Sequence, residues 1–476
     1  MASNLIYQVS DKPGFGKLIS FALQQLLAIM AATIAVPMII GNGMSTSAAL
    51  FGAGVGTLIY LLFTKFKSPV FLGSSFAFLG SMGAAFAGAA TFAGATVGLG
   101  YLGLIIGAIM AGLVYVVIAI IVKFVGARWV SKLMPAVVIG PTVSIIGLSL
   151  AGGAIRDLLG GNGGHGSDIY DGVNLQAFVM DTKAWLCLIC GLVTLCVTIL
   201  CSVYGKKMAK MIPFIIGIFA GYAVALIFTL IGGGNEDFAI LNFGNFTALT
   251  ANGVGVETFF SIPDFTFLTA FQSFGELNGK FSYIATIAVA YVPVAFVVFA
   301  EHIADHKNIS SIIDTDLLEE PGLHRTLLGD GVGSMAGALF GGCPNTTYGE
   351  SIGCVAISGN ASVVTILAAS LMAILVSFIS PFVAFLSSIP SCVMGGVCIA
   401  LYGFISDSGL KMLQPVDLND NHNLFVVSVI LITGIGGLAL GIPVGGTVIK
   451  LTSIACALIL GILVNILLSR KDKKAA

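Results

Sequence analysis

Long apolar runs alternate with short polar segments along almost the whole chain. A membrane-crossing helix needs roughly 20 mainly apolar residues, and in the first half runs of this kind lie at 18–40, 48–66, 70–90, 98–122, 133–153, 184–204 and 212–232. After a more polar stretch they resume at 283–304, 325–341, 347–366, 364–386, 390–406, 423–441 and 446–468. The pattern predicts an all-α polytopic membrane protein with about 14 transmembrane spans.

Composition narrows the functional classes. Only 9% of the 476 residues are charged, against about 25% in an average soluble protein, which excludes a soluble enzyme and a disordered chain. The net charge of −1 provides no basic face for nucleic acid. The five His are expected in loops or at span ends, and Cys187 and Cys190 lie in an apolar run without a second pair of metal ligands. The sequence therefore predicts neither an enzyme nor a metal site.

The basic residues indicate the orientation of the spans. With a cytoplasmic N-terminus, 17 of the 21 Lys and Arg residues fall in inside loops, and the four exceptions are Arg156, Lys183, Lys280 and Lys450. Cytoplasmic loops carry such an excess, and a miscount by one span would scramble it. We therefore expect an even number of spans in a cell inner or plasma membrane, with both termini cytoplasmic.

Two of the predicted spans are interrupted at corresponding places. Seven spans in each half would make the second half enter the membrane from the opposite side, as in an inverted repeat. The third and tenth spans both begin near a proline, Pro69 and Pro344, and become helix-like only after several extended-type residues. Paired interruptions of this kind mark the binding site of a transporter. The alternative is a pair of interfacial loops.

Two acidic residues are predicted within spans, whereas nearly all others lie in loops or at span ends. A carboxylate in the bilayer costs about 2.5–3.5 kcal/mol on insertion scales, so it is a functional hypothesis by default. Glu350 begins the half-helix of the tenth span, where the helix dipole favours a negative charge. Glu301 lies in an apolar run, where burial favours the neutral carboxyl and makes proton exchange possible. A structural hydrogen bond is the alternative for both residues.

Two further acids leave alternatives open. Asp305 lies four residues after Glu301 and on the same helical face, with His302 and His306 on either side. Either Asp305 is close to Glu301, or it has reached the cytoplasmic headgroups and is solvated. For Asp330, a role as a helix-terminal cap is favoured over a role as a ligand.

Five stretches of the chain together resemble the nucleobase–cation symporters, also called nucleobase–ascorbate transporters, which include bacterial uracil and xanthine permeases. The stretches are 71–78, 300–303, 323–331, 344–350 and 389–396. They occur in the expected order over most of the chain. The form Asn-Thr-Thr-Tyr-Gly-Glu at 345–350 looks like the uracil permeases, because purine-reading relatives usually carry a Gln-Asn pair near this position.

The resemblance implies a fold with a core and a gate. The core domain would comprise residues 12–126 and 283–386, and the gate domain residues 127–232 and 387–468. Short strands would interrupt the third and tenth spans, and the substrate would lie between these strands and the eighth span. Members generally work as homodimers, by an elevator-like movement of the core against the gate.

The resemblance also implies the site residues. Substrate-binding roles fall on Glu301, Glu350, Phe76, Gly349, Tyr348 and Ser75, and proton-coupling roles on Glu301, Asp305 and His302. The two glutamates would hydrogen-bond a pyrimidine ring, and backbone N–H groups near Phe76 and Gly349 would meet its carbonyls. No cofactor is implied apart from a proton as the coupling ion.

Two departures from the family pattern concern the coupling ion. Uracil permeases typically carry His where this chain has Asp305, and many relatives have Gln-His where it has Gln24 and Gln25.

The predicted function is import of uracil by proton symport, with a xanthine or uric acid permease of the same family as the alternative.

Overall fold

Helices make up most of the computed structural model, which describes residues 5–475 except 93, 127, 162–168, 172–173, 207, 252 and 445–446. Among these residues, eight helices are long and apolar enough to cross a membrane. They are α1 (Phe15–Ile40), α2 (Thr46–Phe63), α4 (Val97–Val125), α6 (Ala136–Leu158), α7 (Thr182–Tyr204), α9 (Pro213–Ile231), α13 (Phe281–Ile313) and α18 (Ser391–Leu413). The chain is therefore a mostly helical, multi-pass membrane protein, as the apolar pattern predicts.

The remaining elements are shorter or less apolar. The other helices are η1 (Phe76–Phe78), α3 (Leu79–Ala90), α5 (Arg128–Leu133), α8 (Met208–Met211), η3 (Glu236–Phe238), α10 (Gly244–Ala248), α11 (Val256–Phe259), α12 (Thr266–Gln272), η4 (Phe274–Leu277), η5 (Leu318–Gly322), α14 (Leu323–Gly341), α15 (Gly349–Ser358), α16 (Val363–Val376), α17 (Ser380–Ser387), α19 (Asn421–Ile435) and α20 (Ser453–Ala475). The strands are β1 (Leu72–Ser74), β2 (Ile169–Asp171), β3 (Asn174–Ala177), β4 (Asn345–Thr347), β5 (Leu440–Val444) and β6 (Thr447–Leu451), and they pair as β1–β4, β2–β3 and β5–β6.

The residues pack into two units. The first unit comprises Met1–Ser149, Pro263–Leu375 and Phe404–Ala476, and the second comprises Leu150–Ile262 and Val376–Gly403. The division into core and gate domains at the boundaries given above stays a prediction.

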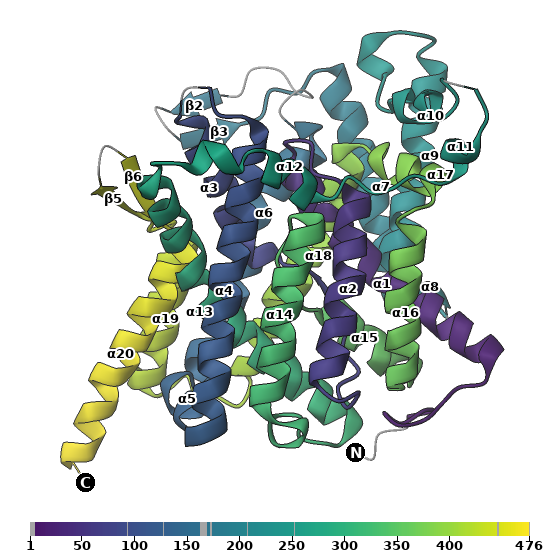
Figure 1. Cartoon of the computed structure of the whole chain (residues 1–476). Helices are drawn as coiled ribbons and strands as arrows, with labels where there is room; N and C mark the ends of the chain where they lie inside the picture. Colours follow the sequence, from purple (N-terminus) through teal and green to yellow (C-terminus); the bar gives the residue numbers. More distant parts are fainter. Residues whose placement is uncertain are drawn as a thin grey trace. The chain divides into compact units, whose positions relative to one another are not determined.

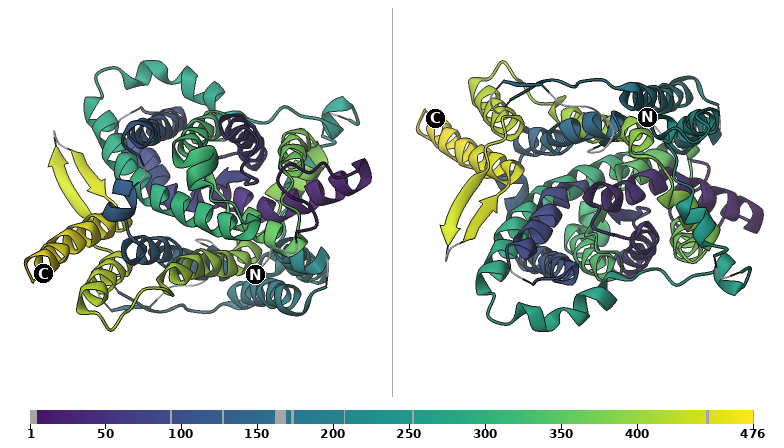
Figure 2. Two further views of the ribbon diagram at one scale, coloured as in Figure 1. Left: turned by 90° about the horizontal axis from the view of Figure 1, so that it is seen from below. Right: turned by 90° about the horizontal axis from the view of Figure 1, so that it is seen from above.

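In the first unit, α14 lies between α2 and α4, as the side view and the views along the helices agree (Figures 1 and 2). The helices approach closely because glycines face each other. A Cβ added at Gly56 would lie 2.8 Å from the carbonyl oxygen of Gly333, and one added at Gly52 would lie 2.6 Å from that of Gly337. Small residues permit such contacts between membrane helices, so this side of α14 cannot accept a larger residue.

The second unit contains α7 and α9 side by side, together with the first part of α18. A Cβ at Gly217 of α9 would lie 2.8 Å from the carbonyl oxygen of Thr194 of α7. Cys187 and Cys190 are buried in α7, as expected for small packing residues.

The chain departs from the predicted spans near its C-terminus. Residues 447–451, expected in the last span, form β6, which pairs with β5 to make a hairpin, and the helix begins only at Ser453. The sequence there is rich in the β-branched residues that fit a pleated strand. The overlapping spans at 347–366 and 364–386 resolve into α15 and α16, because Gly359 ends α15 with a φ of 65°, a left-handed conformation that favours glycine.

Candidate functional site

The two interrupted segments pair with each other inside the first unit. Strand β1 (Leu72–Ser74) runs antiparallel to β4 (Asn345–Thr347), and every residue of both strands is buried. Beyond the strands, the N–H of Ser75 donates to the carbonyl oxygen of Pro344 at 2.9 Å. The pairing supplies the hydrogen bonds that irregular backbone needs at membrane depth. The alternative of two interfacial loops is therefore wrong.

A helix begins directly after each strand. After β4, α15 starts at Gly349 with no side-chain cap, and Glu350 lies in its first turn. The first N–H groups of a helix have no acceptor within the helix, and its positive dipole end favours electronegative atoms. Gly349 is exposed, and a Cβ added there would meet no atom within 4 Å. The start of α15 thus offers donors beside open space.

Glu301 on α13 contributes an unsatisfied carboxyl oxygen. The residue is half-buried, yet its Oε2 atom is buried and has no hydrogen-bond partner among the described residues. Its carboxyl group interacts electrostatically with those of Asp305, Asp330 and Glu350. We refer to these four acids as the carboxyl cluster. The ion pairs found in the described part of the chain bring no Lys or Arg to it.

Asp305 is buried, so the solvated alternative for this residue is wrong. Only 4% of it is exposed, and its Oδ2 accepts a hydrogen bond of 2.7 Å from the hydroxyl of Thr347. Because Thr347 ends β4, this bond ties α13 to the strand pair. The sequence placed Asp305 on the face of Glu301 but contained no signal for its partner.

His302 and Asp330 form a buried pair in the same unit. The Nδ1 atom of His302 lies 2.7 Å from Oδ2 of Asp330, and its Nε2 atom lies 3.0 Å from the hydroxyl oxygen of Thr326. Asp330 lies in the interior of α14, so its interpretation as a helix-terminal cap is wrong. The coupling role predicted for His302 stays a prediction.

Ser75, Phe76 and Tyr348 surround the strand pair. All three are buried, and the Oγ atom of Ser75 has no hydrogen-bond partner within the described ranges. The Tyr348 hydroxyl donates to the carbonyl oxygen of Ser74 at 2.8 Å. The structure therefore brings every predicted substrate-binding residue into one region, formed by α13, β1, β4 and the starts of η1 and α15.

The Tyr348 ring leaves no room for a side chain at Gly73. A Cβ there would lie 2.3 Å from two ring carbons of Tyr348. We expect Gly73→Ala to destabilise the fold by about 1–3 kcal/mol through overpacking, measured as a lower melting temperature of the detergent-solubilised protein. Gly83→Ala is the matched control, because a Cβ at Gly83 would meet nothing within 4 Å. Equal melting temperatures for the two variants would contradict the packing described.

Gln25 of α1 also contacts the site. Its Nε2 atom hydrogen-bonds the hydroxyl of Ser351, which in turn accepts from the N–H of Phe71 at 3.0 Å. Ser351 follows Glu350 in α15, so Gln25 helps to hold this half-helix against β1. Gln25 thus occupies a position beside the site although it departs from the family pattern.

Sequence reasoning missed several buried polar residues around the cluster. The estimate of only two acids within spans was too low, since Asp305 and Asp330 are buried as well. Asp330 lies in a predicted span, so the cost of burying a carboxylate could have identified it as a candidate functional residue. Thr347, Ser351 and Tyr60 resemble ordinary residues of membrane helices, and no local pattern distinguishes them.

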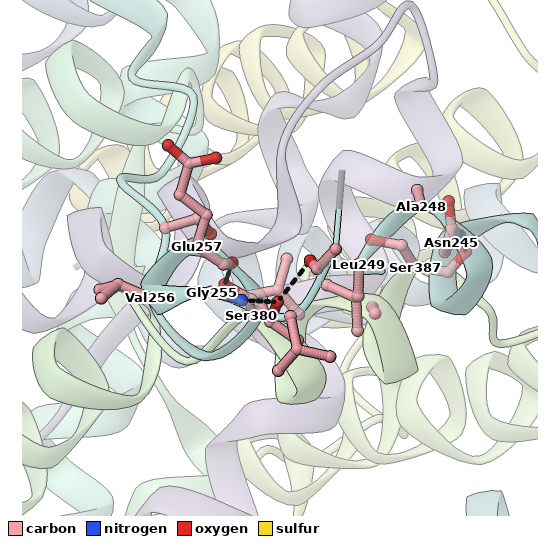
Figure 3. A pocket seen from close by; sticks show the side chains of 14 residues that line it. Asn245, Ala248, Leu249, Gly255, Val256, Glu257, Ser380 and Ser387 are labelled. Atoms are coloured by element: carbon pink, nitrogen blue, oxygen red, sulfur yellow. Dashed lines mark hydrogen bonds between the residues drawn. The ribbon is translucent and has the colours of Figure 1, made fainter. Parts of the chain in front are cut away.

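A separate cavity of about 610 Å³ lies in the second unit, between residues 245–261 and α17 (Figure 3). Its polar groups already bond one another: Asn245 donates to the carbonyl oxygen of Ser387, and the Ser380 hydroxyl donates to that of Glu257. The Glu257 carboxylate points away from Ser380 (Figure 3). The candidate site is therefore the region around β1 and β4.

Comparison with known proteins shows the family of the chain. The model of a permease family, covering xanthine and uracil permeases, matches residues 16–442. Over 472 residues the chain is 38% identical to the uracil permease of Bacillus caldolyticus, with 99% of this chain and 96% of the relative covered. It is 37% identical to the uracil permease of Bacillus subtilis over 98% of this chain and 96% of that protein, and 33% identical to that of Escherichia coli over 95% and 92%.

Solved structures share the fold at low sequence identity. The transmembrane domain of the cyanobacterial bicarbonate transporter BicA matches with a TM-score of 0.59 and 15% identity, covering 96% of this chain and all of that one. The murine anion transporter Slc26a9 matches with a TM-score of 0.61 and 12% identity, over 97% of this chain and 69% of that one. These similarities concern the fold alone.

Proposed function

Since the chain belongs to the nucleobase–cation symporter family, which includes the bacterial uracil permeases, we propose that it imports uracil by proton symport. The observation that carries the proposal is the convergence of Glu301, with its unpartnered Oε2 atom, and the α15 start with Glu350, beside the β1–β4 pair. The relatives named uracil permeases support the substrate.

The chemistry of the region suits a pyrimidine ring. Uracil presents N–H donors and C=O acceptors in alternation around its ring. Carboxylates accept from N–H groups, and free backbone N–H groups at a helix start donate to carbonyl oxygens. Glu301 and Glu350 would bind the ring N–H groups, the backbone near Phe76 and Gly349 would meet its carbonyls, and Tyr348 and Ser75 would shape the pocket. Such a site rejects analogues that leave buried polar atoms unpaired.

The acidic residues of α13 would couple uracil transport to proton movement. Glu301 would exchange the proton, and Asp305 and His302 would assist, because Asp305 shares its helical face and His302 is bonded to Asp330. The proton is the only coupling ion in this scheme, and no cofactor takes part.

Replacing Asp305 by His should change the pH dependence of uptake. The substitution exchanges a group that is neutral or negative for one that is neutral or positive, in contact with Thr347, so the pH at half-maximal rate should move. Uptake measured from pH 5 to 9 tests this. Asp237→His, at an exposed position of η3, is the control. An unchanged profile in Asp305→His would remove Asp305 from coupling.

Transport would follow the architecture implied by the family. We propose about 14 spans in a seven-plus-seven inverted repeat, with the core at 12–126 and 283–386 moving as an elevator against the gate at 127–232 and 387–468. Similarity in fold to two anion transporters supports a transporter architecture. A homodimer in the cell inner or plasma membrane, with both termini cytoplasmic, completes the proposal.

Uptake of radiolabelled uracil into proteoliposomes tests the function. We expect accumulation with an inward proton gradient, collapse of that accumulation with a protonophore, and competition by unlabelled uracil. Uptake of radiolabelled xanthine or uric acid without uptake of radiolabelled uracil would instead identify a purine permease. Accumulation that persists without a proton gradient would contradict proton symport.

A further inference from the structure

A line of buried polar side chains runs from α13 to the loop after α2 and includes none of the residues proposed to bind substrate. The Tyr60 hydroxyl oxygen lies 2.6 Å from Oγ of Ser68 and 2.7 Å from Nε2 of His306. All three residues are fully buried. Tyr60 and His306 are separated by 246 positions in the sequence, so only the fold brings them together.

The hydrogen bonds of this line have a defined direction. The Nδ1 atom of His306 lies 2.7 Å from the carbonyl oxygen of His302, which can only accept, so Nδ1 carries a hydrogen. A neutral imidazole has one N–H, so Nε2 is the acceptor and the Tyr60 hydroxyl donates to it. The Ser68 hydroxyl then donates to the oxygen of Tyr60. The donors are therefore ordered from Ser68 to His306.

The two ends of the line lie in different surroundings. Ser68 follows Lys67, whose side chain is 48% exposed and pairs with Glu320 at the surface. At the other end, the His306 ring stacks on that of His302 with centroids 3.9 Å apart. Asp305 and Asp330 both act electrostatically on Tyr60. The line thus extends from Ser68, the buried neighbour of exposed Lys67, to the ring of His302, which is bonded to Asp330 of the carboxyl cluster.

A purely structural role does not require these residue types. Buried polar groups cost free energy even when paired, and apolar residues of similar volume often pack at least as stably. Imidazole and hydroxyl groups can pass a proton by exchanging donor and acceptor roles. The titratable groups that contact His306 are Tyr60 from α2 and His302 from α13, and Asp305 and Asp330 act electrostatically on Tyr60. No Lys or Arg is paired to these groups in the described part of the chain.

We propose that Ser68, Tyr60 and His306 form the path by which a proton passes between the Lys67 surface and the vicinity of the carboxyl cluster. The proposal rests on the proton symport proposed above. A hydronium ion at the Ser68 end gives a proton to Oγ of Ser68, the former Ser68 proton moves to the oxygen of Tyr60, and the former Tyr60 proton moves to Nε2 of His306. The hydronium becomes water, the imidazole becomes imidazolium, and both hydroxyls end unchanged. The reverse sequence releases the proton.

A proton on His306 is linked to the carboxyl cluster by charge. An imidazolium at His306 would interact favourably with ionised carboxyl groups of the cluster, since opposite charges favour each other's charged forms. Gain of a proton by His306 therefore accompanies its loss from the cluster. Tyr60 and His306 act as positioning and relay residues and do not touch the substrate.

Two transport modes separate this role from a structural one. Exchange of labelled for unlabelled uracil across proteoliposomes needs no net proton movement, whereas net uptake driven by a pH gradient does. We expect Tyr60→Phe and His306→Gln to retain exchange, and to lower net uptake and uracil-induced proton influx by about tenfold or more, since positioned proton-transfer groups contribute effects of at least this size. Tyr115→Phe is the matched control, because it removes a buried hydroxyl that has no partner among the residues described.

The possible results of these transport measurements distinguish the proposed proton path from a structural role. Net uptake and exchange that both remain normal in the two variants would overturn the path. A parallel loss of exchange and net uptake in both variants would show a structural role and overturn it as well. Should the wild-type protein exchange uracil without any uracil-induced proton influx, proton symport itself fails, and this result is distinct from a failure of the path. Because the two substitutions lie on different helices, misfolding of one leaves the other as the test.

Discussion

Glu350→Ala is expected to abolish measurable uracil binding. Glu350 lies in the first turn of α15, beside the open space at Gly349, where its carboxylate would accept from a ring N–H group. A hydrogen bond to a charged group contributes about 1.5–3 kcal/mol, and an unpaired buried donor adds a penalty, so Kd should rise by about a hundredfold or more. Binding of radiolabelled uracil to the purified protein measures the effect.

A matched control separates this effect from a general loss of charge. Glu319 is an exposed acid of the same unit, in η5, and Glu319→Ala should bind uracil as the wild-type protein does. The melting temperature of each variant shows whether the fold survives. Binding by folded Glu350→Ala within a few-fold of the wild type would exclude a direct contact between Glu350 and the substrate.

Glu301→Gln is expected to uncouple binding from accumulation. Glutamine has the size of glutamate and retains an acceptor oxygen, so the variant should still bind uracil, although more weakly. It cannot gain or lose a proton, so a pH gradient can no longer drive transport through this residue. Labelled uracil should therefore reach only its external concentration inside proteoliposomes, while exchange continues.

Glu276→Gln provides the control for this substitution. Glu276 lies in η4, outside the spans, and hydrogen bonds from the backbone N–H and hydroxyl of Thr96 hold the pKa of its carboxyl below its usual value. A carboxylate that stays ionised does not exchange protons at neutral pH, so its removal should leave accumulation intact. Normal gradient-driven accumulation by Glu301→Gln would show that another group carries the proton.

The positions that sequence reasoning identified best are those where the membrane makes a residue type costly. Glu301 and Glu350 were found because carboxylates are rare in apolar segments. The interruptions at β1 and β4 were expected because each follows a proline in an otherwise apolar span, and the family resemblance implied that they are strands. In these cases the signal is local, since it depends on the residue and its neighbours in the chain.

Other features depend on contacts between distant parts of the chain. Asp305 had two equally open interpretations until the structure placed Thr347 at 2.7 Å from it. Asp330 was assigned to a helix end, but its partner His302 lies 28 positions away on another helix. Strand β6 was predicted to be part of a span, because the β-branched residues of a strand are also apolar.

The linear pattern of residues was sufficient to show that this protein crosses a membrane many times and belongs to a nucleobase transporter family, and it predicted that two carboxylates mark the site. Hydropathy and the cost of burying charge act on each segment separately, so a linear pattern reveals them. The pairing of β1 with β4, the grouping of four acids and the line of Ser68, Tyr60 and His306 became visible only in the folded chain. Hydrogen bonds depend on distances of about 3 Å between atoms, and such distances between remote residues are set by packing.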